Sequence, residues 1–316
     1  MKTGLRLKTI SIMIPTYNEE GNVELLYAAI IEEFKTNVKN YDYEIVFIDN
    51  CSKDKTREKL VELCKKDKKV KVIFNAKNFG QLKSPYYGLL QTTGDCSIMM
   101  VADFQDPVEM IHKFIKEWEN GYKIVIGIKN KSKENKIFYF LRTCYYKLIK
   151  KIASTEQIEH FTGFGLYDKE FINVLRDLND SMPYLRGIIS EIGFDRKEIN
   201  YEQPRRLHGK SKNDFFSLYD IGMLGVTSYS KVAIRLATLL GFTIAGTSFL
   251  IGLIYIVLKL LFWNVFIAGT IPIAIGVFFM GAVQLLFLGL MGEYVLNINI
   301  RVMNRPLVVE ERRINF

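Results

Sequence analysis

Two groups of polar residues have the types and spacing to bind a metal ion or a phosphate. Asp103 and Gln105 follow an apolar run, and carboxylate and amide oxygens suit Mg²⁺ or Mn²⁺. Arg206, Ser211 and Lys212 lie in a basic segment that could hold a phosphate through charge-assisted hydrogen bonds. Each group also has an ordinary interpretation, a loop aspartate in one case and a solvated basic loop in the other. Spacing alone therefore leaves both functions open.

The segments that would position these residues alternate between strand and helix patterns. β-Branched apolar runs predict strands at 8–14, 43–48, 70–74, 96–102 and 123–128. Helical patterns lie between them at 21–38, 56–66, 81–92 and 107–120. This alternation predicts a parallel α/β sheet covered on both faces. In such sheets ligands bind outside the carboxyl ends of the strands, and polar clusters follow the first four predicted strands.

The distribution of charge predicts a membrane anchor in the last third of the chain. No Asp, Glu, Lys or Arg occurs from Leu236 to Leu258 or from Leu260 to Gly292, and only Lys259 separates these runs. Their length predicts two transmembrane helices, at about 235–258 and 265–292. Neither of the two charge-free runs contains an ionisable residue, which argues against a transporter. Their glycines would permit a tight hairpin or a homo-oligomer.

Composition and flanking charge indicate a compartment and exclude one class of partner. Basic residues flank the two apolar runs on their outer sides, so the positive-inside rule places both termini in the cytoplasm. The chain carries a net charge of +9, but no nucleic-acid recognition motif accompanies it. Aromatic and basic residues at 136–152, and aromatic residues with few charges at 213–231, predict helices at the membrane surface. Two core helices on the sheet are the alternative.

An ordered set of motifs resembles the family 2 glycosyltransferases of GT-A fold. It comprises IPTYNE at 14–19, D-x-x-S-x-D-x-T at 49–56, NFG at 78–80 and ADFQDP at 102–107. Gly127-Ile128-Lys129, Tyr184-Leu185-Arg186-Gly187, the 206–212 segment and the two apolar runs extend the resemblance to membrane-anchored polyprenyl-phosphate glycosyltransferases. It implies a GT-A (Rossmann-like) α/β domain over 1–212, a juxtamembrane helix over 213–231, two transmembrane helices within 232–294 and a cytoplasmic tail over 295–316.

The resemblance also implies a role for individual residues. Asp103 and Arg206 would be catalytic, and Asp103 with Gln105 would hold Mg²⁺ or Mn²⁺. The nucleotide sugar would be bound by Pro15, Tyr17, Glu19, Asp49, Asn78 and Asp103. The acceptor phosphate would be bound by Lys129, Arg206, Ser211 and Lys212.

Several positions depart from the family pattern. Val101 and Asn50 stand where acidic residues are common, and Lys129 stands where relatives usually have Arg. Gly163 and Gly165 stand where close relatives often have Asp and Arg, which predicts a wider pocket with a different choice of substrate.

Two aspartates keep a structural alternative beside a functional one. Asp49 would either accept a hydrogen bond from the nucleotide base or cap a turn at the end of a buried strand. Asp106 would either cap the helix that follows it or serve the site.

These expectations combine into one reaction with two alternatives. The chain is expected to be an inverting, metal-dependent enzyme of the cell membrane that transfers a sugar from a nucleotide sugar to polyprenyl phosphate at the cytoplasmic face. The product would serve surface polysaccharide or glycan modification. One alternative keeps the enzyme class but uses a lipid-linked saccharide or diacylglycerol as acceptor. The other is a degenerate GT-A module that binds nucleotide without turnover.

Overall fold

The computed structural model describes residues 7–129, 158, 160–204, 206–207, 223, 232–262 and 270–316. The chain divides into two compact units. The first contains residues 1–146, 157–214 and 303–316, and the second contains 147–156 and 215–302. The predicted surface helix at 136–152 lies outside the described residues, as does all of 213–231 except Met223. Each unit is described by itself below.

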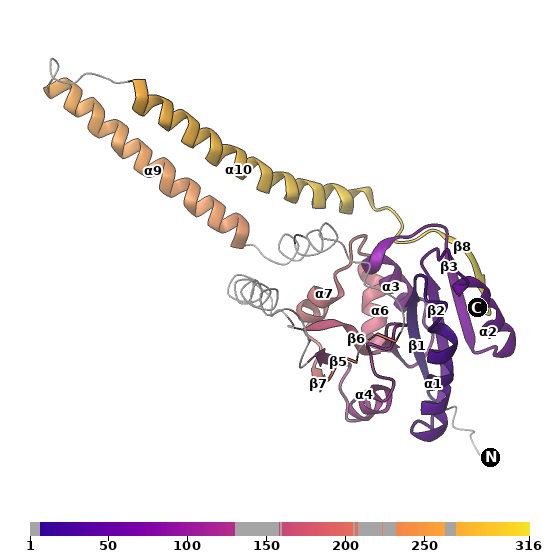
Figure 1. Cartoon of the computed structure of the whole chain (residues 1–316). Helices are drawn as coiled ribbons and strands as arrows, with labels where there is room; N and C mark the ends of the chain where they lie inside the picture. The colour runs from indigo at the N-terminus through magenta and orange to yellow at the C-terminus, as the bar shows by residue number, and fades with distance from the viewer. Residues whose placement is uncertain are drawn as a thin grey trace. The chain divides into compact units, whose positions relative to one another are not determined.

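The first unit is built on an eight-stranded mixed sheet with the order β7-β5-β6-β4-β1-β2-β3-β8 (Figure 1). At its centre β1 runs parallel to β2 and β4, and β2 runs parallel to β3. β6 is antiparallel to β4 and β5, and β8 is antiparallel to β3. The strands are β1 Thr9–Thr16, β2 Asp42–Asp49, β3 Val70–Asn75, β4 Cys96–Met99, β5 Ile124–Lys129, β6 Phe161–Asp168, β7 Arg196–Tyr201 and β8 Glu310–Ile314.

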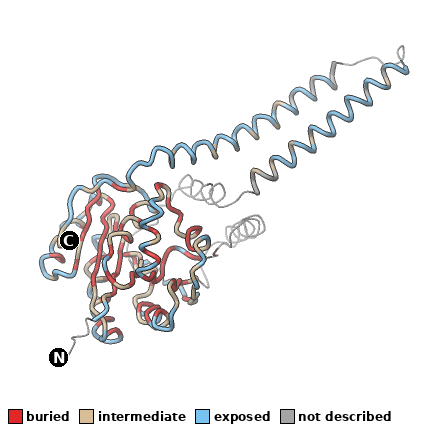
Figure 2. Tube along the Cα trace, turned by 180° about the vertical axis from the view of Figure 1, so that it is seen from behind, coloured by how far each residue is buried: buried red, intermediate tan, exposed pale blue. Residues whose placement is uncertain are grey.

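Helices cover both faces of this sheet. Side chains alternate along a strand, so Ile12 of β1 packs into the cluster that contains Leu26 of α1 and Leu60 of α2, whereas Met13 faces Gly88 of α3. The central strands are largely buried, and Figure 2 shows the buried residues gathered in the interior of this unit. The helices are α1 Val23–Thr36, α2 Thr56–Lys66, α3 Gly80–Leu90, α4 Met110–Glu119, α6 Lys169–Leu178 and α7 Leu185–Ile192.

The sequence pattern located the first half of this fold and missed the second. All five predicted strands and all four predicted helices of the first half are present. The sheet is mixed rather than parallel throughout, because β6 and β8 join it in the antiparallel direction. β7 (RKEINY) and β8 (EERRI) are edge strands whose charged residues hide the strand signal. The predicted capping of α4 by Asp106 is wrong, because α4 begins at Met110 after Glu109 and has no side-chain cap.

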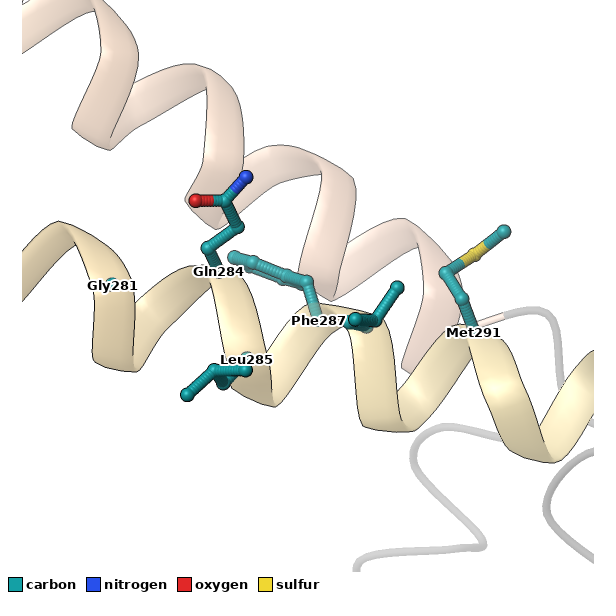
Figure 3. A pocket seen from close by; sticks show the side chains of 6 residues that line it. Gly281, Gln284, Leu285, Phe287 and Met291 are labelled. Carbon is teal, nitrogen blue, oxygen red and sulfur yellow. The ribbon is translucent and has the colours of Figure 1, made fainter.

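The second unit contains two helices that are long and apolar enough to cross a membrane. α9 spans Val232–Leu261 and α10 spans Thr270–Met303, with candidate membrane segments at Ala237–Leu258 and Phe279–Met303. Figure 2 shows both helices largely exposed. A shallow pocket on α10 is lined by Gly281, Gln284, Leu285, Phe287, Leu288 and Met291 (Figure 3).

The glycines of these two helices do not make the close helix contact that their size would permit. A Cβ built at any of them, from Gly241 in α9 to Gly292 in α10, meets no atom within 4 Å. Among the described residues these glycines therefore make no close helix contact, and α9 and α10 remain long and apolar enough to form the expected transmembrane hairpin. After α10 ends at Met303 the chain returns to the first unit, where β8 extends the sheet beside β3.

Candidate functional site

The loops that follow β1 and β2 interlock at the carboxyl edge of the sheet. The backbone N–H of Asn18 donates to the Ser52 hydroxyl at 2.8 Å, and the Asn18 side-chain oxygen accepts from the N–H of Lys53 at 2.8 Å. Asn18 and Cys51 adopt left-handed backbone conformations, with φ of 56° and 64°. Asn tolerates this conformation better than most residues, and the two turns let the loops face each other. The IPTYNE and D-x-x-S-x-D-x-T motifs therefore form one surface.

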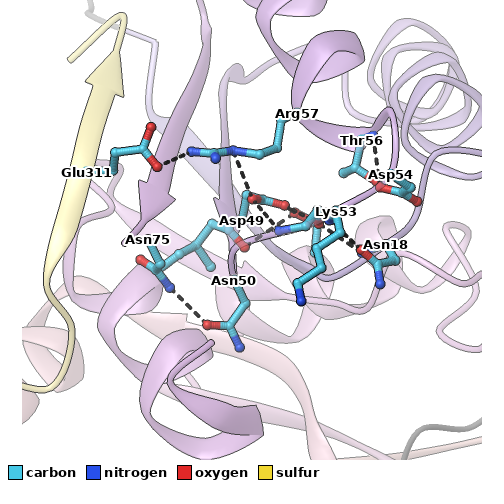
Figure 4. A network of polar contacts seen from close by, with 12 residues as sticks. Asn18, Asp49, Asn50, Lys53, Asp54, Thr56, Arg57, Asn75 and Glu311 are labelled. Atoms are coloured by element: carbon cyan, nitrogen blue, oxygen red, sulfur yellow. Dashed lines mark hydrogen bonds and ion pairs between the residues drawn. The ribbon is translucent and has the colours of Figure 1, made fainter. Parts of the chain in front are cut away.

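Asp49, the last residue of β2, is fully buried within this surface (Figure 4). One carboxylate oxygen accepts from the backbone N–H of Ser52 at 3.0 Å, and the other accepts from the Ser52 hydroxyl. Burial raises the pKa of the Asp49 carboxyl, while the Ser52 hydrogen bonds and the charge of Arg57, at 3.6 Å, act against that rise. The turn-capping interpretation of Asp49 is thus seen directly. Its contact with a nucleotide base stays a prediction.

Three asparagines organise the neighbouring loop after β3. Asn50 donates through Nδ2 to the Asn78 side-chain oxygen at 2.7 Å and to the Gly80 carbonyl at 3.2 Å. Its own oxygen accepts from the Asn75 amide at 3.1 Å and from the Phe79 N–H at 2.8 Å. A carboxylate at position 50 could accept but not donate, so this network accounts for Asn50 in place of an acid. Asn78 lies in the network, and its predicted nucleotide contact remains untested.

The other residues predicted to line the nucleotide pocket follow β1. Pro15 lies in β1, and Tyr17 and Glu19 come directly after it, both half-buried. Glu19 accepts from the Asn22 amide at 2.6 Å, and its backbone N–H donates to the Thr56 hydroxyl at 2.7 Å. The structure therefore groups these residues at the edge where the loops meet, and their binding roles stay predictions.

Asp103 and Arg206 lie against each other although about a hundred residues separate them in sequence. Arg206 Nε is 3.1 Å from one Asp103 carboxylate oxygen, and the other oxygen accepts from the Gln105 N–H at 3.1 Å. The Leu207 N–H also approaches the Asp103 carbonyl oxygen at 3.4 Å. The Asp103 side chain is 8% exposed and that of Arg206 is 33% exposed. The predicted metal-binding and acceptor-binding groups thus meet at one carboxylate. Ser211 and Lys212 lie outside the described residues.

Asp106 supports this region from inside. Its carboxylate accepts from the Val101 N–H at 3.0 Å and from the Tyr201 hydroxyl at 3.1 Å. Burial raises the Asp106 pKa to about 6, although these hydrogen bonds and the charge of Lys129 lower it. Lys129, the last residue of β5, therefore lies close enough to act on this carboxyl. Asp106 ties the β4 loop to the end of β7, a role that the sequence did not predict.

The two glycines of β6 are required by packing rather than by a wider pocket. A Cβ at Gly165 would lie 2.5 Å from the Val125 carbonyl oxygen. Gly163 has a φ of +103°, and a Cβ there would lie 2.4 Å from the end of the Met99 side chain. The expectation that these glycines open a substrate pocket is therefore wrong. They let the backbone of β6 approach β5 and β4.

The donor atoms around Asp103 fit a hard divalent cation that is completed by a ligand. Among the described residues, no three His, Cys, Asp or Glu side chains cluster in a way that would hold a metal ion. Asp103 offers carboxylate oxygens and Gln105 an amide oxygen, which is an incomplete set for Mg²⁺ or Mn²⁺. A diphosphate would have to supply the remaining oxygens.

These features describe an α/β domain in which the motif loops lie at the carboxyl ends of the central strands. The chain belongs to glycosyl transferase family 2, whose family model matches residues 11–193. It is 36% identical over 309 residues to the putative glycosyltransferase CsbB of Bacillus subtilis, covering 97% of this chain and 91% of that one. It is 32% identical to the bactoprenol glucosyl transferase of Shigella phage SfII, covering 94% and 96%. The family membership, the enzyme class and the GT-A α/β fold expected from the motifs are confirmed.

Solved structures also resemble this chain. The mannosyl-3-phosphoglycerate synthase of Rubrobacter xylanophilus is 15% identical with a TM-score of 0.48, covering 74% of this chain and 75% of that one.

Proposed function

We propose that this enzyme transfers a sugar from a nucleotide sugar to polyprenyl phosphate. The names of relatives that match almost end to end, including bactoprenol glucosyl transferases of Shigella phages, support this acceptor. The observation that carries the proposal is the contact of Arg206 with Asp103. It joins a carboxylate that could hold the divalent cation of the donor diphosphate to a cationic side chain that suits the acceptor phosphate, at the edge where the loops converge.

The reaction needs a binding site for the acceptor phosphate more than it needs a general base. A phosphate monoester is largely ionised near neutral pH, so one of its oxygens can attack the anomeric carbon directly. The bond from that carbon to the donor diphosphate breaks, the diphosphate leaves with the electron pair, and an inverted sugar-phosphate bond forms. Arg206 and Lys129 would hold the attacking phosphate, and Asp103 would orient the leaving group.

A divalent cation, when bound at Asp103 and Gln105, would neutralise charge that grows on the leaving diphosphate. Before donor binding, Arg206 neutralises Asp103 instead. We infer that donor binding at Asp103 releases the guanidinium, which then becomes available to the acceptor phosphate. Arg206 would thus be occupied until the donor is in place.

The membrane helices suit a lipid acceptor. Candidate spans at Ala237–Leu258 and Phe279–Met303 would anchor the enzyme where polyprenyl phosphate resides. Basic residues such as Arg235 and Arg305 flank them and favour a cytoplasmic site with both termini inside. The product would then be used in surface polysaccharide or glycan modification.

Transfer to a defined lipid tests this proposal. Purified full-length protein is incubated with labelled sugar nucleotides, undecaprenyl or dolichyl phosphate, and Mg²⁺ or Mn²⁺, and the lipid phase is then analysed. Label in the lipid that disappears when the acceptor is first treated with alkaline phosphatase supports the proposal. Label that appears only with diacylglycerol or a lipid-linked saccharide would change the acceptor. Nucleotide binding without any transfer would favour a non-catalytic module.

A further inference from the structure

The C-terminal strand β8 contacts the loop that is expected to receive the donor nucleotide. Glu311 of β8 forms an ion pair with the Arg57 Nη2 atom at 2.6 Å, and Arg57 belongs to the first turn of α2. On its other side, Arg57 Nε lies 3.6 Å from the buried Asp49 carboxylate. Figure 4 shows the guanidinium lying between the two carboxylates. Glu311, which lies 254 positions from Arg57 in sequence, therefore reaches Asp49 through this arginine.

The aromatic ring of Phe74 holds this arginine in place. The Arg57 guanidinium lies 4.8 Å from the centre of the buried Phe74 ring, and Arg312 of β8 lies 4.7 Å from it. Phe74 pairs with Arg312 in the β3–β8 ladder, so the two guanidinium groups lie against the same ring. A guanidinium over an aromatic face is attracted by the ring's electron density. The position of Arg57 thus depends on the presence of β8.

Asp49 needs a cation near it to remain a useful hydrogen-bond acceptor. Its side chain is fully buried, and burial without a partner disfavours the charged form. The groups that face it are the Ser52 hydroxyl and N–H, the Thr16 hydroxyl from β1 and the Arg57 guanidinium from α2. Of these groups, Arg57 alone carries a positive charge. Among the described residues no acceptor lies within hydrogen-bonding distance of the buried Arg57 Nε. The Nε–H of Arg57 therefore donates to no other group there.

We propose that Arg57 and Glu311 are positioning residues for the nucleotide part of the donor, and that β8 is part of the donor site. Glu311 orients the guanidinium, and the guanidinium holds Asp49 as an oriented carboxylate that can accept from a base N–H. This inference rests on the proposed use of a nucleotide sugar, but it concerns binding of the nucleotide and not the transfer step.

Nucleotide binding to the full-length protein in detergent tests this inference without the lipid acceptor. UDP and GDP are titrated calorimetrically, and the tighter ligand is used for the variants. Glu311→Gln should weaken binding about threefold, because a half-exposed ion pair is screened by solvent. Arg57→Met should weaken it about tenfold or more, and Arg57→Lys should recover part of the loss.

Glu310→Gln is the matched control. Glu310 belongs to the same strand, but its carboxylate contacts Tyr87 and Arg313 instead of Arg57. The affinity of the Glu310→Gln variant for the nucleotide should equal that of the natural protein. Binding by Arg57→Met should also weaken at a higher pH than in the natural protein, because loss of the cation lets Asp49 protonate sooner.

Two outcomes would overturn the inference, and they can be told apart from failure of the proposed function. Equal affinities in Glu311→Gln and Glu310→Gln, together with unchanged binding in Arg57→Met, would show that β8 only completes the sheet. A lowered melting temperature in these variants without weaker binding would show the same. A natural protein that binds neither UDP nor GDP would contradict both the inference and the proposed function. One that transfers sugar while all variants bind alike would contradict the inference alone.

Discussion

Replacement of Arg206 by Ala should weaken the use of the lipid acceptor without weakening the binding of the donor. The guanidinium is expected to exchange one partner for another during the reaction, the Asp103 carboxylate for the acceptor phosphate. The effect of its removal is therefore the difference between two interactions. Both can be bounded from the structure.

The first interaction is an ion pair of 3.1 Å between side chains that are 33% and 8% exposed. Solvent screens such a partly exposed pair, so it contributes about 1 kcal/mol. The second is a charge-assisted hydrogen bond to a phosphate, worth about 1.5–3 kcal/mol. The net loss for Arg206→Ala is then about 0.5–2 kcal/mol, or roughly a 2- to 30-fold fall in kcat/KM for the acceptor. Arg206→Lys should lie between, because it keeps charge but loses the planar fork.

The assay measures sugar transfer to undecaprenyl phosphate in detergent micelles at saturating donor, with the acceptor varied. Arg196→Ala is the matched control. Arg196 begins β7, whereas Arg206 follows the end of that strand, and Arg196 pairs with Glu198 at 3.2 Å. Its kinetics should be unchanged. An Arg206→Ala enzyme with normal acceptor kinetics would refute the reasoning, as would a loss confined to the KM for the donor.

Three further changes follow from the same structure. Asp103→Asn should lower kcat about 100-fold or more, with weaker activation in a Mg²⁺ titration, because a neutral amide is a poor ligand for a hard cation; near-normal turnover would contradict the assignment. Burial raises the pKa of Glu44, but hydrogen bonds from Lys71, Ser11 and Thr93 lower it further, so its net pKa is depressed. Its contribution to stability is present above the unfolded pKa and lost as pH falls through the folded value. Thermal melting should therefore show Glu44→Gln less stable than the natural protein by about 1–3 kcal/mol at pH 7, with the difference shrinking as the pH is lowered into the acidic range, and a difference independent of pH would contradict this. Gly165→Ala should destabilise the domain by about 1–3 kcal/mol because its Cβ would meet the Val125 carbonyl; a melting temperature equal to that of the natural protein would count against the packing argument.

Local pattern was sufficient where a segment is buried on both faces and flanked by turn residues. β1 and β2 are continuous β-branched apolar runs, so their strand signal does not depend on their neighbours. Two runs without charge likewise predicted α9 and α10, because lipid tolerates few charged residues over about 20 positions. The motifs that identified the family lie in loops after such strands, where function rather than packing selects the residues.

The remaining features depend on contacts between segments that are distant in sequence. In the sequence, β8 resembles a charged tail. It is a strand because it pairs with β3, and this pairing places Glu311 beside Arg57. The glycine at position 165 predicted a wider pocket, but the carbonyl oxygen of Val125 lies beside the place where a Cβ would be.

The sequence by itself determined the enzyme class, the central strands and the two apolar helices, because local composition and spacing are enough to indicate each of them. Tertiary structure decided which charges meet. It placed Arg206 on Asp103 and turned Asp106 from a helix cap into a buried support for Val101 and Tyr201. The energy of an ion pair depends on separation and burial, and neither quantity can be read from positions along a chain.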